Sequence, residues 1–269
     1  MDPEDPPNPD EPPAAPEGAV DTHCHLFLME GDPAGAVSRA NEAGVASLIC
    51  VGIDPESSRR SLELAESFRG VFATAGMHPH TASGLDRQAG AVIEELLADP
   101  MVVGVGETGL DYYRMLSPLE DQQRAFKAHI ALSRETGKPL VVHVREAWED
   151  ALRILAEGSA ERIVLHCFSG TPEIAIEAGR RGYFVSFAGN VTYPNAGPLR
   201  EAAAAVAEGL LLTETDSPFL SPQSTRGRPN DPTNVLAVVE ALASARGNSA
   251  AATTTATASA AARAFPLVR

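Results

Sequence analysis

Three residues near the start of the chain are spaced in a way that suits metal binding. Asp21, His23 and His25 are separated by single residues and follow an apolar start. Successive side chains of a strand point to opposite faces, so these three would share one face. Two imidazoles on one face can hold a divalent cation, and an acid in line with them can orient them. The alternative, a pair of core or surface histidines, explains an isolated histidine better than this alternating trio.

Two further histidines end apolar runs of the same kind. His143 follows the run 139–142, and His166 follows the run 163–165. Both positions are predicted to be the carboxyl ends of strands, where barrel enzymes carry their catalytic groups. If the chain folds as a barrel, four imidazoles would meet at one mouth, and unrelated core histidines account poorly for that placement.

Carboxylates complete the set of candidate ligands. Glu107 follows the run 101–106, and Glu214 and Asp216 follow the run 210–213, where alternation would place both on one face. A carboxylate has two oxygens and can bridge two cations, as two-metal hydrolysis requires. A carboxylated lysine can also bridge two ions in metal-binding barrels, but the two lysines of this chain, Lys127 and Lys138, do not lie at the end of the fourth predicted strand. Glu107 is therefore the expected bridge. The alternative for each acid is a solvated loop residue or helix cap, and for Glu214 both interpretations are equally supported.

A repeating pattern of elements would position these residues. Short apolar runs alternate with segments of helical periodicity, and Pro118 provides a helix start signal. The predicted strands are 19–25, 46–53, 71–76, 102–107, 139–144, 162–167, 183–187 and 210–215. The clearest predicted helices are 33–43, 56–69, 87–98 and 119–136. Eight strands alternating with helices predict an α/β protein, a single TIM (β/α)₈ barrel domain spanning residues 20–269.

The two ends of the chain depart from this pattern. Residues 1–19 hold seven prolines and six acids without a base, which predicts a disordered acidic tail. The stretch 243–264 is rich in alanine and threonine. We expect a terminal helix docked on the barrel there, in preference to disorder, because alanine favours helices.

Composition restricts location and redox state. No apolar run reaches the roughly 18 residues of a membrane span, and the N-terminus has no basic, apolar leader. The cysteines Cys24, Cys50 and Cys167 are few and odd in number, which favours a reducing cytoplasm over disulfides. Strand alternation predicts that Cys167 faces away from His166 as a buried structural thiol, rather than serving as a ligand or nucleophile. We expect a cytoplasmic monomer without a membrane partner.

The net charge of −15 argues against a basic surface that coats nucleic acid. With the six acids of residues 1–19 set aside, the remainder still carries −9 and would repel a polyphosphate at long range. Any reaction on nucleic acid must therefore depend on local contacts and bound metal ions.

Taken together and in order, the motifs of this chain resemble those of the TatD-related deoxyribonucleases. The likeness covers about residues 19–265, and the combination is specific, whereas Asp-x-His-x-His alone marks only the wider metal-hydrolase superfamily. The matching strings are VDTHCHL from Val20, GMHPH from Gly76, GETGLDYY from Gly106, HVREA from His143, HCFSG from His166 and ETDSP from Glu214.

The resemblance implies a distorted TIM barrel with two divalent ions that hydrolyses DNA, as a 3′–5′ exonuclease on single strands. Mg²⁺ is the expected ion, with Mn²⁺ or Zn²⁺ as alternatives. Asp216 would also accept a proton from the attacking water, which makes it and Glu107 the candidate catalytic residues. The implied ligands are His23, His25 and Asp216 for one ion, His143 and His166 for the other, Glu107 for both, and Glu214 as an additional candidate.

Substrate contacts are predicted from the same motifs. His78 matches a histidine that the family places near the substrate phosphate. Arg145 and Arg228 are candidates for charge stabilisation, with surface ion pairs as the alternative.

Three aromatic residues, Tyr112, Tyr113 and Phe168, could stack on bases. Ordinary packing behind the loops is an equally supported interpretation.

Two other functions remain open from the sequence alone. One is a related metal-dependent hydrolase of a small-molecule amide or ester, which would suit the acidic surface. The other is a catalytically silent scaffold or binding protein, which would suit the unusual tail.

Overall fold

A computed structural model describes residues 16–268, and the first 15 residues of the predicted acidic tail lie outside that range. Eight parallel strands form one sheet whose order follows the sequence. The strands are Ala19–Cys24 (β1), Val45–Val51 (β2), Val71–Ala75 (β3), Val102–Asp111 (β4), Leu140–Arg145 (β5), Ile163–His166 (β6), Phe184–Phe187 (β7) and Leu211–Thr213 (β8). The predicted TIM barrel is confirmed.

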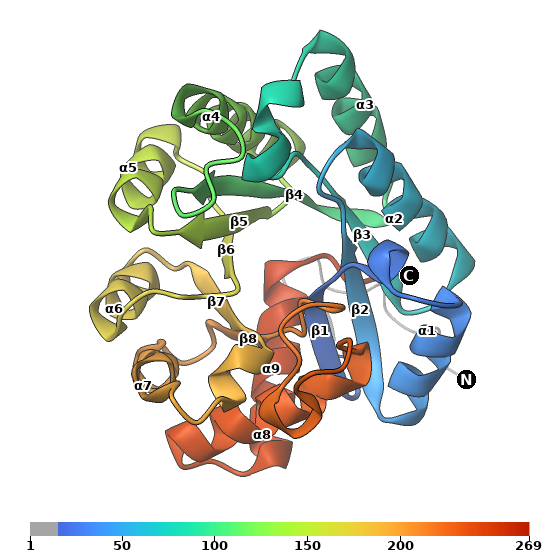
Figure 1. Ribbon diagram of the computed structural model, residues 1–269, viewed down its shortest axis with the longest axis vertical. Helices are drawn as coiled ribbons and strands as arrows, with labels where there is room; N and C mark the ends of the chain where they lie inside the picture. Colours follow the sequence, from blue (N-terminus) through green and yellow to red (C-terminus); the bar gives the residue numbers. More distant parts are fainter. Residues whose placement is uncertain (1–15, 269) are drawn as a thin grey trace, which may run out of the picture.

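Helices surround the strands, as Figure 1 shows. They are Pro33–Glu42 (α1), Pro55–Ser67 (α2), Arg87–Leu97 (α3), Leu119–Thr136 (α4), Trp148–Gly158 (α5), Pro172–Arg180 (α6), Gly197–Ala205 (α7), Val235–Arg246 (α8) and Ala250–Ala264 (α9). Local sequence explains several starts, because the side chains of Asp32, Asp54 and Asp86 accept hydrogen bonds from the first turns of α1, α2 and α3. None of the helices between residues 16 and 268 has the length and apolar character needed to cross a membrane.

The barrel closes between β8 and β1 through side chains, loops and one isolated parallel bridge between Cys24 and Ser217. The hydroxyl of Thr22 donates to the carbonyl of Thr213 at 3.0 Å, and the hydroxyl of Thr213 donates to the carbonyl of Val20 at 3.0 Å. Beyond the strand ends, the N–H of Asp216 donates to the carbonyl of His23 at 2.8 Å. We call the contact of β1 with β8, and of the residues that follow each strand, the seam. The seam therefore holds the segments that carry His23 and Asp216 side by side.

The interior of the barrel is a closed apolar core. Every strand contributes to it, through Val20, Ile49, Val51, Phe72, Val103, Val141, Val164, Phe184 and Leu212. Helix α9 packs against this group with its alanines and with Phe265, which follows its last turn and is fully buried. The docked terminal helix is thus confirmed over 250–264, while Gly247, with φ of 68°, ends the preceding helix α8.

Two strand ends differ from the sequence prediction in ways that affect the site. Strand β4 continues to Asp111, four residues beyond the predicted end, whereas β8 stops at Thr213, two residues before it. The short β8 leaves Glu214 and Asp216 outside regular strand geometry, and Asp216 has a positive φ of 56°. Their shared face, expected from alternation, is therefore not formed.

Candidate metal centre

At the carboxyl end of the barrel, one oxygen of Glu107 faces three imidazoles. Glu107 lies in β4 and is 2% exposed. Its Oε1 lies 3.3 Å from His78 Nε2, 3.0 Å from His143 Nδ1 and 3.3 Å from His166 Nε2. His143 and His166 come from β5 and β6, where they are register partners. The parallel strands therefore bring these predicted residues to one point.

The other oxygen of Glu107 faces a second group of side chains. Its Oε2 lies 3.3 Å from His23 Nε2 and 4.0 Å from His25 Nε2. Across the seam, Asp216 Oδ1 lies 3.5 Å from His25 Nε2 and 3.9 Å from His23 Nε2. Glu107 thus stands between two imidazole groups, one on each oxygen.

Hydrogen bonding behind the imidazoles decides which nitrogen faces the cluster. The Nδ1 of His25 lies 2.8 Å from the carbonyl oxygen of Val51, and because a carbonyl can only accept, Nδ1 carries the hydrogen. Neutral His25 then presents the lone pair of Nε2 to His23 Nε2, 3.3 Å away, and to Asp216. Lone pairs and carboxylate oxygens that converge in this way fit a divalent cation.

The charges of the cluster favour a positive group between its carboxylates. Burial alone would raise the pKa of Glu107, but the imidazoles of His78, His166 and His23 hold that pKa well below its usual range. Burial would likewise lower the pKa of His166, yet the carboxylates of Glu214 and Glu107 raise it well above its ordinary value. A metal ion would supply this positive charge without a proton.

A carboxylate that the sequence did not single out lies behind His143. Asp111 ends β4, is fully buried, and places Oδ2 2.8 Å from His80 Nε2 and 3.4 Å from His143 Nε2. Its Oδ1 accepts hydrogen bonds from two N–H groups of the following turn. Burial would raise the pKa of Asp111, but His143, the main chain and His80 hold it far below its usual range. Asp111 therefore stays ionised and orients His143, whose Nδ1 faces Glu107.

Glu214 lies behind His166 in a similar way. Its Oε1 lies 2.9 Å from His166 Nδ1, while His166 Nε2 faces Glu107. The same oxygen accepts a hydrogen bond from the N–H of Cys167 at 2.8 Å. Glu214 is thus placed to orient His166 from the side opposite Glu107, rather than beside Asp216.

The predicted orientation of Cys167, facing away from His166, was wrong. Strand β6 ends at His166, and Cys167 adopts a left-handed φ of 43°, so strand alternation does not reach it. Its thiol is only partly buried and lies within 4.8 Å of ligand atoms of His166 and Glu214. Burial raises the pKa of this thiol well above its usual value, which keeps it protonated and poorly nucleophilic.

Comparison with known proteins identifies the family. A family model described as TatD related DNase matches residues 20–266. The chain belongs to the TatD family. An uncharacterized metal-dependent hydrolase of Bacillus subtilis, YabD, is 37% identical over 227 residues, covering 83% of this chain and 89% of the relative. A Shigella flexneri protein named 3′-5′ ssDNA/RNA exonuclease TatD is 35% identical over 223 residues, covering 80% and 85%.

A solved structure agrees with this assignment. The TatD homologue YjjV of Escherichia coli matches with a TM-score of 0.88 and 28% identity, over 92% of this chain and 98% of its own. The chain is thus a metal-dependent hydrolase of the TatD family, and its candidate metal centre is the cluster around Glu107.

His78, the predicted phosphate contact of this TatD protein, is arranged as a hydrogen-bond donor. Its Nδ1 accepts a hydrogen bond from the N–H of His80 at 3.1 Å. Burial lowers the pKa of His78 to about 4, so at neutral pH its one ring hydrogen lies on Nε2, which faces Glu107. Unlike His25, His78 presents a donor and not a lone pair to the cluster.

The remaining predicted substrate contacts differ in how accessible their side chains are. Arg145 stacks on Tyr113, with its guanidinium carbon 3.9 Å from the ring centroid, and Arg228 is exposed. Tyr112 is half-buried and its hydroxyl donates to Asp150. Phe168 is 1% exposed and packs against other aromatic rings, so it cannot stack on a base.

The segment that carries Arg228, a predicted substrate contact, has a structural function as well. Asn230 is buried, and its side-chain amide donates to the carbonyls of Thr215 and Phe219 at 2.8 and 2.7 Å. The N–H of Asn230 donates to the carbonyl of Pro218. Asn230 therefore holds the segment that carries Asp216.

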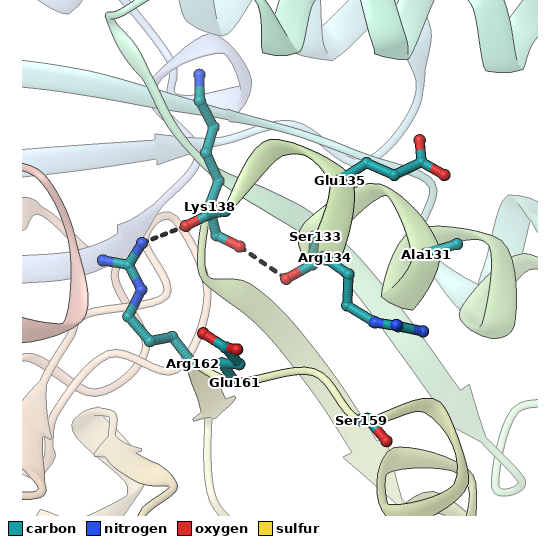
Figure 2. A pocket seen from close by; sticks show the side chains of 9 residues that line it. Ala131, Ser133, Arg134, Glu135, Lys138, Ser159, Glu161 and Arg162 are labelled. Atoms are coloured by element: carbon teal, nitrogen blue, oxygen red, sulfur yellow. Dashed lines mark hydrogen bonds between the residues drawn. The ribbon is translucent and has the colours of Figure 1, made fainter.

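A surface hollow at the opposite end of the barrel is not a second centre. It lies where α4 leads into β5 and where β6 begins, and Figure 2 shows that Lys138 extends away from Arg134 and Glu161. The Lys138 ammonium donates to three main-chain carbonyls, and Ser133 donates to the carbonyl of Lys138. These hydrogen bonds stabilise the fold, and the polar side chains that line the hollow do not converge on a ligand.

Proposed function

We propose that this chain is a two-metal-ion deoxyribonuclease that removes nucleotides from the 3′ end of single-stranded DNA. The observation that carries the proposal is that the two carboxylate oxygens of Glu107 face different histidines. One oxygen faces His143 and His166, and the other faces His23 and His25. Two cations bridged in this way are suited to phosphodiester hydrolysis. The substrate and polarity are supported by relatives named 3′-5′ ssDNA/RNA exonucleases.

The proposed ligands follow the two groups. His23, His25 and Asp216 would hold one ion with Glu107 Oε2, and His143 and His166 would hold the other with Oε1. Mixed imidazole and carboxylate ligands admit Mg²⁺, Mn²⁺ or Zn²⁺, and Mg²⁺ is our expectation. When bound, the ions lower the pKa of an attacking water and neutralise the phosphate and the leaving oxygen.

The side chains of the chain supply proton transfer and orientation. Burial would raise the pKa of Asp216, but its contact with His25 and the charges of the neighbouring imidazoles lower it, so Asp216 is ionised and can accept the proton of the attacking water. The Nε2–H of His78 would donate to a phosphate oxygen of the substrate. Arg145 and the exposed Arg228 would hold flanking phosphates.

The test is cleavage of a 5′-end-labelled single-stranded oligonucleotide with Mg²⁺, Mn²⁺ or EDTA. Glu107→Gln keeps the shape of the bridge but removes its charge, and we expect a loss of roughly a thousandfold, because several kcal/mol of charge stabilisation disappear. The matched control is Glu94→Gln, an exposed acid of α3, which should retain wild-type activity. Shortening from the 3′ end would establish the polarity.

Metal binding is measured separately through thermal unfolding, since an ion that binds only the folded state raises Tm. A rise in Tm with Mg²⁺ or Mn²⁺ that Glu107→Gln weakens is expected. If the wild type binds the ions and cleaves no oligonucleotide, the nuclease proposal is refuted.

A second candidate function is hydrolysis of a small-molecule amide or ester. The net charge of −15 favours it, because this substrate would not be repelled by the acidic surface. Assays with cyclic amides and lactones distinguish the two. Turnover of these compounds, together with inactivity on phosphodiesters, would support the second function.

A further inference from the structure

Exposed apolar side chains are concentrated around the mouth that holds the metal centre. Among the large apolar residues that the described chain exposes, only Ile176 and Val268 lie elsewhere. The others follow the carboxyl ends of β1, β4 and β8, and they are Leu28, Tyr113, Met115, Leu116, Leu119 and Phe219. Apolar surface gathered at one place marks a binding region rather than random exposure.

Two of these residues are aromatic and lie on opposite sides of the mouth. Phe219 follows β8, and its ring centroid lies 6.1 Å from that of His25 after β1. Tyr113 follows β4 and lies against Arg145 at the end of β5. In a ring of eight strands in sequence order, the β8–β1 side is opposite the β4–β5 side. The cluster around Glu107 therefore lies between the two rings.

Both rings stand on a firmly held backbone. The N–H of Phe219 donates to the carbonyl of Asp216 at 2.8 Å, and its carbonyl accepts from Asn230 at 2.7 Å. The N–H of Tyr113 donates to Asp111 at 3.0 Å. The side chains are nevertheless 51% and 58% exposed. An exposed ring on a fixed backbone can bind a flat partner with less loss of conformational entropy than a ring on a mobile loop.

We propose that Phe219 and Tyr113 each stack on an unpaired base, so that two successive nucleotides straddle the centre with their linking phosphate above Glu107. The inference rests on the proposed nuclease function and names what the enzyme recognises, the bases of a single-stranded end. Because the net charge is −15, general attraction to the phosphate backbone is weak. Base stacking is attractive for every base and independent of that charge.

The test compares two 5′-labelled oligonucleotides, one with natural nucleotides at its last two 3′ positions and one with abasic residues there. Phe219→Leu and Tyr113→Leu retain an apolar side chain without a flat face, Phe219→Trp restores one, and Ile176→Leu is the control on α6. On the natural end, each of the two ring-removing variants should lose about tenfold in kcat/KM, the weight of one base–aromatic stack. On the abasic end they should equal the wild type, and Phe219→Trp should equal it on both.

A second measurement does not depend on turnover. A 2-aminopurine base at the 3′ end should lose fluorescence when it stacks in Glu107→Gln, and adding Phe219→Leu and Tyr113→Leu should abolish that quenching. Equal activity of the two ring-removing variants and the wild type on natural ends, or equal losses on natural and abasic ends, would overturn the stacking proposal. Inactivity of the wild type on both oligonucleotides would refute the nuclease function itself.

Discussion

A buried histidine away from the metal centre makes the stability of this protein sensitive to acid. His129 lies on α4 and is fully buried. Its Nδ1 lies 2.7 Å from the carbonyl of Ala125, and its Nε2 accepts a hydrogen bond from the N–H of Met77 at 3.0 Å. The contact with Ala125 requires a hydrogen on Nδ1, and the contact with Met77 requires a lone pair on Nε2, so the ring is neutral. Burial lowers the pKa of His129 from 6.5 to about 4.

The direction and size of the effect follow from these two pKa values. Below pH 6.5 the unfolded chain takes up a proton at this residue, while the folded chain does not until about pH 4. The unfolded state thus binds more protons in this window, so the contribution is complete above pH 6.5 and is lost as pH falls toward 4. At 1.36 kcal/mol per pKa unit, the full loss is about 3 kcal/mol, of which about 2 kcal/mol is lost by pH 5.

Urea unfolding between pH 5 and pH 7.5, with EDTA present, measures this contribution against His129→Gln. Glutamine can still accept from Met77 but does not titrate in this range. Acidification affects other groups equally in both proteins, so only the difference matters. We expect the wild type to lose about 2 kcal/mol more than His129→Gln between pH 7 and pH 5. Parallel stability curves for the two proteins would refute the reasoning.

Two further predictions concern single side chains that hold the main chain. Lys138→Met leaves three main-chain carbonyls without their ammonium donor and should lower the free energy of unfolding by about 2 kcal/mol. The control Lys127→Met, at an exposed position of α4, should leave that free energy unchanged. Equal urea midpoints for Lys138→Met and the wild type would contradict the role given to Lys138. Asn230→Ala removes both amide hydrogen bonds to the segment after β8 and should lower stability by about 2 kcal/mol. The same variant should weaken ion binding in a Tm titration, and unchanged ion affinity would show that the segment is held by other contacts.

The parts of the site that lie on strands could be predicted from the sequence. Glu107, His143 and His166 follow apolar runs, His23 belongs to an alternating trio in the first strand, and the parallel barrel brings such strand ends together. Asp111 was missed because β4 was predicted to end at Glu107, although Glu107, Gly109 and Asp111 alternate in the sequence. Extending that strand by two alternations would have found it.

The remainder depends on loop conformations that periodicity does not report. Cys167 and Asp216 have positive φ, so the alternating pattern stops before each of them. The backbone of Phe219 is held by Asp216 and by Asn230, which lies 11 residues further along the chain. Residues of this kind are placed by contacts between loops, and no local spacing encodes those contacts.

The seam between β1 and β8 has a consequence for when this protein can become active. Its hydroxyl–carbonyl contact between Thr213 and Val20 joins residues 193 positions apart. Asp216 reaches His23 of β1 and His25, which follows β1, only through the same closure. During synthesis the N-terminal strand emerges first and must wait for the last strand. A nascent chain therefore carries the histidines of the candidate metal centre before Asp216, and the candidate centre is complete only after the segment that follows β8 has left the ribosome.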